Sequence, residues 1–352
     1  MTKPPGPVAI IGAGSWGTGL AKLLGDQGLD VRLWAYEQHV CDALKRTRTN
    51  PVYLPDVRLA DTVSCHTVFG DVLPGAAIVC FVTPSHVLRA VASSCAGYVP
   101  EHALLVSATK GIESETARLP AQVLADVLGN GISGRLAVLS GPSFAVEVAR
   151  GLPTAVTVAA RDEAVGRTLQ NALATPVFRV YLSSDVTGVQ LGGAVKNVIA
   201  IATGIADGLG LGHNARAALI TRGLAEMMRL GERLGADPLT LSGLSGLGDL
   251  VLTCTSELSR NRTLGFRIGR GETLERITSG TPMVAEGVRT STAVVQLAQR
   301  TGVEVPISRQ VHEILHLGKP PQAAVSELLA RALKAEQPRP ADAKPGPRSA
   351  DT

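Results

Sequence analysis

The stretch from Val189 to Asp207 reads VQLGGAVKNVIAIATGIAD; it is apolar at nearly every position and carries one lysine, Lys196, near its middle. In a helix, one face around this lysine would hold only small residues, namely Gly192, Gly193, Ala200, Thr203 and Gly204. A face of this kind predicts the close approach of a flat molecule or of another backbone. The opposite face is typical of a protein core.

Lys196 itself has two interpretations. Burial disfavours the charged ammonium and lowers the pKa of a lysine, which suits a residue that exchanges a proton near neutral pH. Alternatively, the aliphatic stem leads the charge to solvent, or to a carboxylate that pairs with it for structural reasons. A membrane span is disfavoured, because the run is marginal in length and carries Lys196, Asn197 and Asp207 without flanking aromatic residues.

Upstream of this helix, the apolar run Val8–Gly12 leads into Gly12-Ala13-Gly14-Ser15-Trp16-Gly17 and then into a helical pattern up to Leu24. This GxGxxG pattern between a strand and a helix predicts dinucleotide binding. Gly12 permits the tight turn, Gly14 lets a pyrophosphate reach the backbone, and Gly17 lets helix and strand pack closely. The amides at the start of the helix would face the phosphates.

The second predicted strand, Asp30–Trp34, ends just before Tyr36 and Glu37, where the residue that meets the adenosine ribose is expected. Glu37 could accept a hydrogen bond from a ribose 2′-hydroxyl, or it could simply be solvated beyond the strand. No arginine stands at Tyr36 to bind a 2′-phosphate, so the sequence favours NAD over NADP.

Three further apolar strands are predicted at residues 76–82, 103–107 and 136–139, and strand-like runs at 154–158 and 177–182 complete the sheet. Their alternation with helical stretches predicts a Rossmann-type parallel sheet with helices on both faces. Ligands bind beyond the carboxyl ends of such strands, which is where Lys110 and the turn from Gly141 to Ser143 fall. Lys110 is the natural anchor for an anion, although it could also be an exposed loop residue.

From about Thr187 onward the chain is predicted to be all helical, so we expect a dinucleotide-binding domain at 1–186 and a helical substrate domain at 187–335. Residues 336–352, rich in proline, alanine and balanced charge, are expected to form a disordered tail. The run from Ser259 to Arg262 is dense in groups that bind phosphate, or else caps a helix. His312 and His316 share a predicted helix face without a third ligand, so we expect no metal site.

The 352-residue chain is 45% hydrophobic, which is typical of a globular protein of two domains. Its net charge of +4 is spread along the chain without a basic stripe, so nucleic acid is not an expected partner. The five scattered cysteines fit a reducing compartment. No signal-peptide pattern follows Met1, so we expect a cytoplasmic protein.

From Val8 to about Leu333 the chain resembles the bacterial NAD(P)-dependent glycerol-3-phosphate dehydrogenases. The resemblance lies in the order and spacing of several short runs: Gly12–Thr18, Ala108–Glu113, Ser140–Ala145, Ala194–Asn197, Gly246–Asp249, Thr253–Thr255, Ser259–Arg262 and Glu286–Gly287. It implies reversible hydride transfer between NAD or NADP and dihydroxyacetone phosphate, giving sn-glycerol 3-phosphate for phospholipid synthesis. Tyr36 stands where many family members have arginine or histidine, a departure that bears on the use of NADPH.

The resemblance also implies two sets of site residues. The dinucleotide would contact Ser15, Trp16, Lys110, Ala145, Arg260, Val284 and Glu286. The substrate would contact Lys110, Gly141, Ser143, Lys196, Asp249, Ser259, Arg260 and Asn261.

The chemistry of the residues agrees with this reading. A ketone that accepts hydride develops negative charge on its oxygen, so the site needs an acid beside that oxygen and little competing water. Lys196 is the expected acid, Asp249 would orient its ammonium, and Asn197 would help to orient the substrate. The small face beside Lys196 would then admit the nicotinamide and a three-carbon substrate.

Two alternatives remain at this point. In β-hydroxyacid dehydrogenases an asparagine lies four residues after the catalytic lysine, whereas here position 200 is alanine and the asparagine is the adjacent Asn197. A non-catalytic NAD(H)-sensing protein would not need Lys110, Lys196, Asp249 and Arg260 together. The large apolar faces of the helical domain also predict a homodimer.

Overall fold

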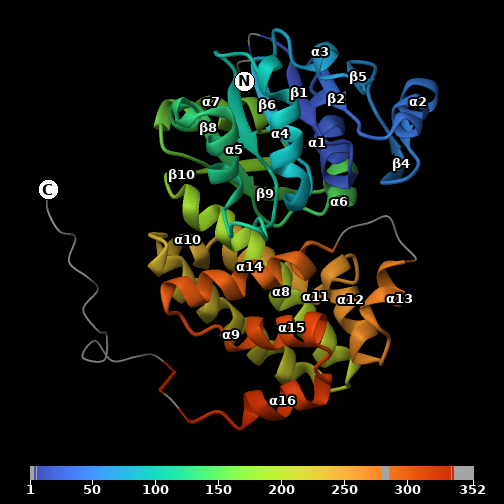
Figure 1. The fold of residues 1–352 in the computed structure, drawn as a ribbon. Coiled ribbons are helices and arrows are strands. Elements are labelled where there is room, and N and C mark those ends of the chain that lie inside the picture. Colours follow the sequence, from blue (N-terminus) through green and yellow to red (C-terminus); the bar gives the residue numbers. More distant parts are fainter. Residues whose placement is uncertain (1–3, 5, 280–284, 334, 337–352) are drawn as a thin grey trace, which may run out of the picture.

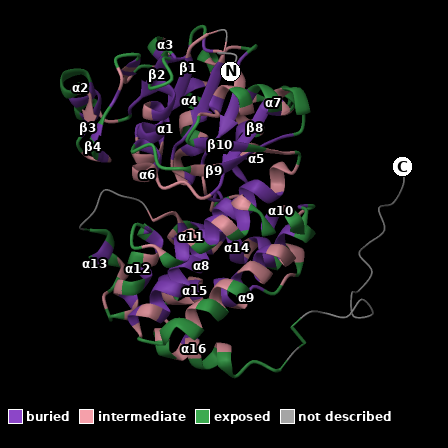
Figure 2. Cartoon of the chain, turned by 180° about the vertical axis from the view of Figure 1, so that it is seen from behind, coloured by how far each residue is buried: buried purple, intermediate pink, exposed green. Residues whose placement is uncertain are grey.

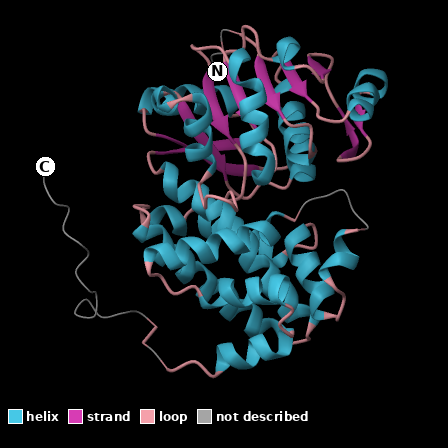
Figure 3. Ribbon diagram, viewed as in Figure 1, coloured by secondary structure: helices cyan, strands magenta, loops and turns pink. Residues whose placement is uncertain are grey.

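The computed structural model describes residues 4, 6–279, 285–333 and 335–336, and Figures 1 and 3 show an α/β part followed by an entirely helical part. The strands of the main sheet are β1 Val8–Ile11, β2 Val31–Trp34, β5 Val63–His66, β6 Ile78–Phe81, β7 Leu104–Ser107, β8 Leu136–Ser140, β9 Thr154–Ala160 and β10 Phe178–Ser183. A separate hairpin pairs β3 Thr49–Asn50 with β4 Leu54–Arg58.

The main sheet has the order β10-β9-β8-β7-β6-β1-β2-β5. From β5 to β8 all neighbouring strands are parallel, as predicted. In contrast, β9 runs antiparallel to β8, and β10 pairs with β9 in parallel. The short helix α6, Ala145–Ala149, explains this difference. It packs on the helix α1, Ser15–Gly25, at the carboxyl edge of the sheet, so the chain re-enters the sheet from that edge.

Helices cover both faces of the sheet because its strands are buried on both sides. In β1, Val8 and Ile10 belong to one core and Ala9 and Ile11 to the other. The first core includes residues of α1, α2 Gln38–Thr47, α6 and α7 Glu163–Leu173. The second includes residues of α3 Phe69–Val72, α4 Leu88–Cys95 and α5 Pro120–Leu128. Short 3-10 turns complete this part: η1 Ser85–Val87, η2 Ala96–Tyr98 and η3 Asn130–Gly134.

The helical part begins two residues after β10, where the side chain of Asp185 caps α8 by accepting a hydrogen bond from Gly188 N at 2.7 Å. Its elements are α8 Val186–Gly208, α9 Gly212–Arg233, α10 Pro238–Ser242, the π-helical turn η4 Leu244–Gly248, α11 Asp249–Thr255, α12 Arg260–Gly269, α13 Leu274–Thr278, α14 Glu286–Thr301, α15 Pro306–Leu317 and α16 Pro321–Leu329. The π-helical turn η4 leads directly into α11, because Asp249 follows Gly248 without an intervening loop.

Helix α8 lies at the centre of this part, and Figure 2 shows it buried along its length. It is long and apolar enough to cross a membrane, yet its apolar segment is entirely inside the protein core. The backbone of α12 crosses it closely: a Cβ on Gly204 would lie 2.0 Å from Arg262 O, and one on Gly265 would lie 2.1 Å from Ile201 O. Glycine is required at this crossing because any side chain would collide with a backbone atom.

Candidate active site

Two lysines and one carboxylate meet where the sheet faces the helical part. Lys196 Nζ, on α8, donates to Asp249 Oδ1 at 2.5 Å. Lys110 Nζ, in the loop after β7, donates to Asp249 Oδ2 at 2.9 Å. Asp249 begins α11, and its side chain is 1% exposed. Two cations around one carboxylate leave a net positive charge in a buried site, which suits an anionic ligand.

Thr253 completes the surroundings of Lys196, and the sequence reasoning did not assign it to the site. Its hydroxyl accepts from Lys196 Nζ at 2.8 Å and donates to Asp249 O at 2.6 Å. The signal was present, because Asp249 and Thr253 lie four residues apart and so share a helix face. Burial lowers the pKa of Lys196 to about 8, against the opposing effect of Asp249.

The partners of the two lysines differ in a way that matters for chemistry. An ammonium has three hydrogens to donate. Lys110 Nζ donates to Gly141 O at 2.8 Å and to Ser143 Oγ at 3.3 Å besides Asp249, so its three donors are all engaged. Lys196 has two partners among the described residues, Asp249 and Thr253, which leaves one donor direction for a ligand.

The loop that carries Lys110 is fixed by a buried carboxylate. Glu113, 6% exposed, accepts two hydrogen bonds of 2.8 Å from the guanidinium of Arg89 on α4, which lowers the pKa of its carboxyl group. On the other side, Gly141 has φ 144°, and a Cβ there would lie 2.9 Å from Val156 Cα. The Glu113–Arg89 pair holds the loop that carries Lys110, and the conformation of Gly141 sets the carbonyl to which Lys110 donates. Together they set the position of the Lys110 ammonium.

Two asparagines link the elements of the site by their side-chain amides. Asn197 Nδ2 donates to Lys110 O at 3.2 Å and to Gly193 O at 3.3 Å, and Asn197 Oδ1 accepts from Asn261 Nδ2 at 2.9 Å. Asn261 Oδ1 accepts from Gly287 N at 2.9 Å. Both donors of Asn197 are thus engaged by backbone carbonyls, while Asn261 retains one amide hydrogen for a ligand.

The run from Ser259 to Arg262 divides into two roles. Ser259 caps α12 by accepting from Arg262 N at 3.2 Å, and the exposed side chain of Arg260 lies at the start of this helix. A helix N-terminus beside an arginine is a suitable place for a phosphate. Arg262 instead forms an ion pair of 2.7 Å with Asp207, whose side chain is 6% exposed and also pairs with Arg216.

The small face of α8 is filled by protein rather than left for a ligand. A Cβ on Gly192 would lie 2.5 Å from Ser245 O of η4, and one on Gly193 would lie 2.5 Å from Ser140 Oγ. Of the two approaches predicted from the sequence, close backbone packing is the one observed at Gly192 and Gly204. The expectation that this face admits the nicotinamide and the substrate is therefore wrong at those two positions, because backbone already occupies the space.

The glycine-rich turn fits a dinucleotide. Gly14 is the N-cap of α1 and provides no side-chain cap, so the first amides of the helix are free to bind phosphate. A Cβ on Gly14 would meet nothing within 4 Å, whereas one on Gly17 would lie 1.8 Å from Gly12 O. Gly14 thus leaves open space at the helix start, and Gly12 and Gly17 hold helix and strand together. Trp16 Nε1 is buried without a partner in the described structure, so it has a donor available for a ligand.

Both parts of the chain match the models of one protein family. The model of the NAD-dependent glycerol-3-phosphate dehydrogenase N-terminus matches residues 7–166, and that of the C-terminus of the same family matches residues 185–326. The chain belongs to this family. It is 51% identical to the glycerol-3-phosphate dehydrogenase (NAD(P)+) of Geobacter sulfurreducens over 330 residues. These residues cover 94% of this chain and 98% of that protein. A relative with the same name from Syntrophotalea carbinolica is 52% identical over 329 residues, covering 94% and 99% of the two chains.

Solved structures agree with the family assignment. The glycerol-3-phosphate dehydrogenase of Coxiella burnetii superposes with a TM-score of 0.88 at 43% identity, covering 93% of this chain and 99% of that one. D-mandelate dehydrogenase shares 11% identity with a TM-score of 0.60, which shows a shared fold and nothing further. The predicted enzyme class and its NAD or NADP cofactor are confirmed by the family, and neither the hydroxyacid nor the sensor alternative is supported.

In this member of the family, the remaining predicted cofactor residues lie on several different elements. Ala145 is packed on Gly19 of α1. Glu286 bridges the two parts of the chain, accepting from Ser85 N at 3.0 Å and from Ser85 Oγ at 2.6 Å. Tyr36 follows β2 with 79% of its surface exposed. Val284 and most of the predicted tail lie outside the described residues.

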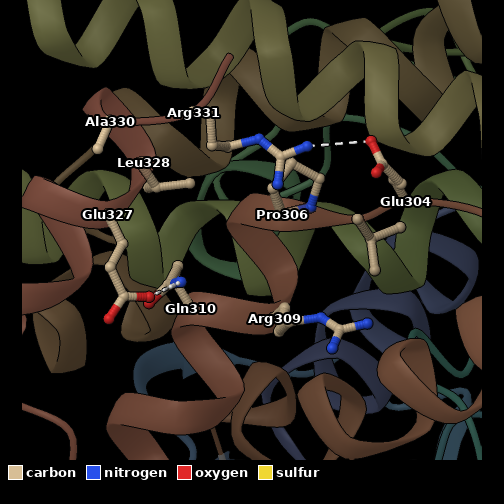
Figure 4. A pocket seen from close by; sticks show the side chains of 9 residues that line it. Glu304, Pro306, Arg309, Gln310, Glu327, Leu328, Ala330 and Arg331 are labelled. Atoms are coloured by element: carbon tan, nitrogen blue, oxygen red, sulfur yellow. Dashed lines mark hydrogen bonds and ion pairs between the residues drawn. The ribbon is translucent and has the colours of Figure 1, made fainter.

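Two further features, a cavity and a pair of histidines, lie away from Lys110 and Lys196. A cavity of about 590 Å³ opens between α15 and α16 (Figure 4), but none of the predicted site residues lines it. Within it Arg331 forms an ion pair with Glu304, and Gln310 Nε2 donates to Glu327 Oε2 at 3.0 Å. His312 and His316 face hydroxyls of α14, at 3.3 Å from Thr292 Oγ1 and 3.1 Å from Ser291 Oγ. These histidines thus pack one helix on another.

Proposed function

We propose that this chain interconverts dihydroxyacetone phosphate and sn-glycerol 3-phosphate by reversible hydride transfer with NAD or NADP, and that Lys196 is the general acid and base. In the cell this activity would serve glycerophospholipid synthesis in the cytoplasm. One observation supports this role for Lys196. Its ammonium has two partners among the described residues and so keeps one hydrogen for a ligand, whereas all three hydrogens of the Lys110 ammonium are engaged. The nicotinamide, when bound, supplies or accepts the hydride.

The residues divide the remaining work between them. Lys196 gives its proton to the carbonyl oxygen during reduction and removes it from the hydroxyl during oxidation. Asp249 and Thr253 orient the ammonium and keep its charge close to the developing oxyanion. Lys110 adds positive charge to the same site and links it to Gly141 and Ser143. Arg260, Ser259, Asn261 and the start of α12 would bind the substrate phosphate.

The test of this proposal is the initial rate of cofactor oxidation by the purified protein with dihydroxyacetone phosphate, measured with NADH and with NADPH. Dihydroxyacetone without its phosphate is the matched control, since it offers the same ketone to Lys196 but nothing to α12. We expect oxidation only with the phosphorylated ketone. Equal rates with both ketones would refute the proposed phosphate-binding site. Binding of the cofactor without any oxidation would refute the proposed reaction.

The assembly state is a separate expectation. The homodimer predicted from the apolar faces of the helical part stays a prediction. Light scattering of the purified protein at several concentrations would test it, and a single mass of one chain throughout would refute it.

A further inference from the structure

Helices α8 and α12 lie side by side with their backbones in contact (Figure 1). Each helix contributes two glycines four residues apart, Gly204 and Gly208 on α8 and Gly265 and Gly269 on α12. A Cβ on any of the four would collide with a backbone oxygen of the other helix. Glycines permit this close approach but provide no side chains that interlock, so groups beside the crossing must hold α12 at one place along α8.

Two adjacent residues of α12 provide such groups. Asn261 Nδ2 donates to Asn197 Oδ1 at 2.9 Å, and the guanidinium of Arg262 pairs with Asp207 Oδ2 at 2.7 Å. Asn197 and Asp207 are ten residues apart on α8, which is about 15 Å along a helix. The backbone of Arg262 meets α8 at Gly204, between these two points. The first turn of α12 is therefore held to α8 from two directions.

Two guanidinium groups fix the carboxylate of Asp207. Its Oδ2 accepts from Arg262 Nε at 3.0 Å and lies 2.7 Å from Arg262 Nη2. On the other side, Oδ1 accepts from Arg216 Nε of α9 at 2.9 Å and lies 2.7 Å from Arg216 Nη2. Two nitrogens of one planar group set the direction of each contact as well as its length. Asp207 thus gives α12 a directional link to α8 and gives α9 a second one.

The place of α12 determines the distance between the two halves of the proposed site. Lys196 lies on α8, whereas Ser259, Arg260 and Asn261, which are proposed to bind the phosphate, lie at the start of α12. In a three-carbon substrate the ketone and the phosphate are separated by a fixed number of bonds, so these two halves must be a fixed distance apart. A displacement of about 1 Å at either end is enough to slow an enzyme severely.

We propose that Asp207, acting through Arg262, is a positioning residue that holds the start of α12 at the distance from Lys196 that the substrate requires. In this role neither Asp207 nor Arg262 contacts the substrate. The inference rests on the proposed function for the place of the phosphate, and it adds what sets that place. Arg216 pairs with the same carboxylate but belongs to α9, so its loss is the matched control.

Charge and position have opposite effects in Asp207→Asn. Removal of the carboxylate leaves two arginines near the start of α12 with one negative charge fewer, so electrostatics alone would tighten the binding of a phosphate. Loss of the link would weaken it, because the phosphate-binding groups would no longer be held in place. We expect the second effect. The KM for dihydroxyacetone phosphate should rise about tenfold, while kcat falls less than about threefold and the dissociation constant for NADH is unchanged.

The experiment compares full-length wild type with Asp207→Asn, Arg262→Met, Arg262→Lys and Arg216→Met. Initial rates give kcat and KM, and urea denaturation gives the stability of each variant. Calorimetry gives the dissociation constant of dihydroxyacetone phosphate in the presence of NAD or NADP, a pair of oxidised compounds that cannot react with each other.

The link to α12 should separate the variants. Asp207→Asn and Arg262→Met should each raise the KM and the dissociation constant of dihydroxyacetone phosphate about tenfold. Arg262→Lys keeps the charge but loses the planar fork, so we expect a rise of about threefold. Arg216→Met should lower stability to a similar extent and leave both constants at their wild-type values.

The outcomes separate this inference from the proposed function. An unchanged or lower KM in Asp207→Asn, or an equal rise in Arg216→Met, would overturn the inference even if the reaction proceeds. If wild type binds dihydroxyacetone phosphate without turnover, and Asp207→Asn and Arg262→Met weaken that binding, the inference stands and the proposed reaction falls. Failure of wild type to bind dihydroxyacetone phosphate would overturn both.

Discussion

Lys196 on α8 and Asp249 on α11 are 53 residues apart in the chain, and their side chains meet at 2.5 Å with both groups almost fully buried. Two buried charges are costly unless they are paired and hydrogen-bonded. Asp249 meets this condition by accepting from both lysines, and Thr253 adds a neutral partner for Lys196. The pair therefore keeps a lysine ammonium in a buried site, which is what the proposed proton transfer by Lys196 needs.

Replacement of Lys196 by methionine should abolish most turnover while leaving the cofactor site intact. Methionine matches the length of the aliphatic stem, so the loss reports the ammonium rather than a cavity. We expect kcat to fall about 10²- to 10⁴-fold, the usual contribution of a general acid, with little change in the dissociation constant for NADH. Lys319→Met, on the distant loop between α15 and α16, is the matched control. A Lys196→Met variant with a tenth of wild-type turnover would contradict the assignment.

The two directions of the reaction should have opposite pH profiles. Because the pKa of Lys196 is lowered to about 8, the protonated form that reduction needs declines above that pH, and the neutral form that oxidation needs declines below it. The kcat for reduction should fall about tenfold per unit above this value, and that for oxidation should rise toward it.

Asp249→Asn provides the check on this profile. Asp249 raises the pKa of Lys196 against the effect of burial, so its loss should move both midpoints to lower pH. The rates of reduction and of oxidation, each measured from about pH 6 to about pH 10, would show the shift. Midpoints that stay in place in Asp249→Asn would show that another group titrates.

Glu226 should contribute to stability rather than to chemistry. This buried carboxylate of α9 caps α15, accepting from Ile307 N at 2.5 Å, Ser308 N at 3.1 Å and Ser308 Oγ at 2.9 Å. In Glu226→Gln an amide NH2 would face these donors, so we expect a loss of about 2 kcal/mol in the free energy of unfolding. Glu232→Gln, exposed on the same helix, should be neutral. Urea denaturation measures both, and equal midpoints would refute the capping role.

The crossing of α8 and α12 should tolerate no side chain at Gly204. Alanine would gain about 1 kcal/mol in helix propensity, but its Cβ would lie 2.0 Å from Arg262 O, so we expect a net loss of about 3 kcal/mol or more. Gly97→Ala is the control, because a Cβ there meets nothing within 4 Å. If the two variants unfold at the same denaturant concentration, the close crossing does not exist in solution.

Much of the local structure was predictable from short windows of sequence. The apolar runs that became β1, β6, β7 and β8, the glycine-rich turn and the helical stretch after residue 187 all follow from side-chain periodicity and from the conformations that glycine allows. The positions of Lys110 and Gly141 at strand ends placed them on the same edge of the sheet. Lys196 was conspicuous because an apolar helix has few reasons to carry a charge.

Other features required the tertiary structure. The direction of β9 depends on where α6 packs, and the roles of Arg262 and Arg260 diverge because Asp207 lies beside only the former. Thr253 joins the site, and backbone atoms fill the face at Gly192, because of how α11 and η4 approach α8.

The physical reason for this division lies in the range of the forces involved. Backbone preference and burial pattern are properties of residues near one another in sequence, so short windows of sequence indicated most of the strands, the helices and the glycine-rich turn. The partner of a charged or polar group is decided by which distant elements pack together, and that packing is the sum of many small contacts over the whole chain. The pairing of Lys196 with Asp249 and of Arg262 with Asp207 therefore became definite only in the folded protein.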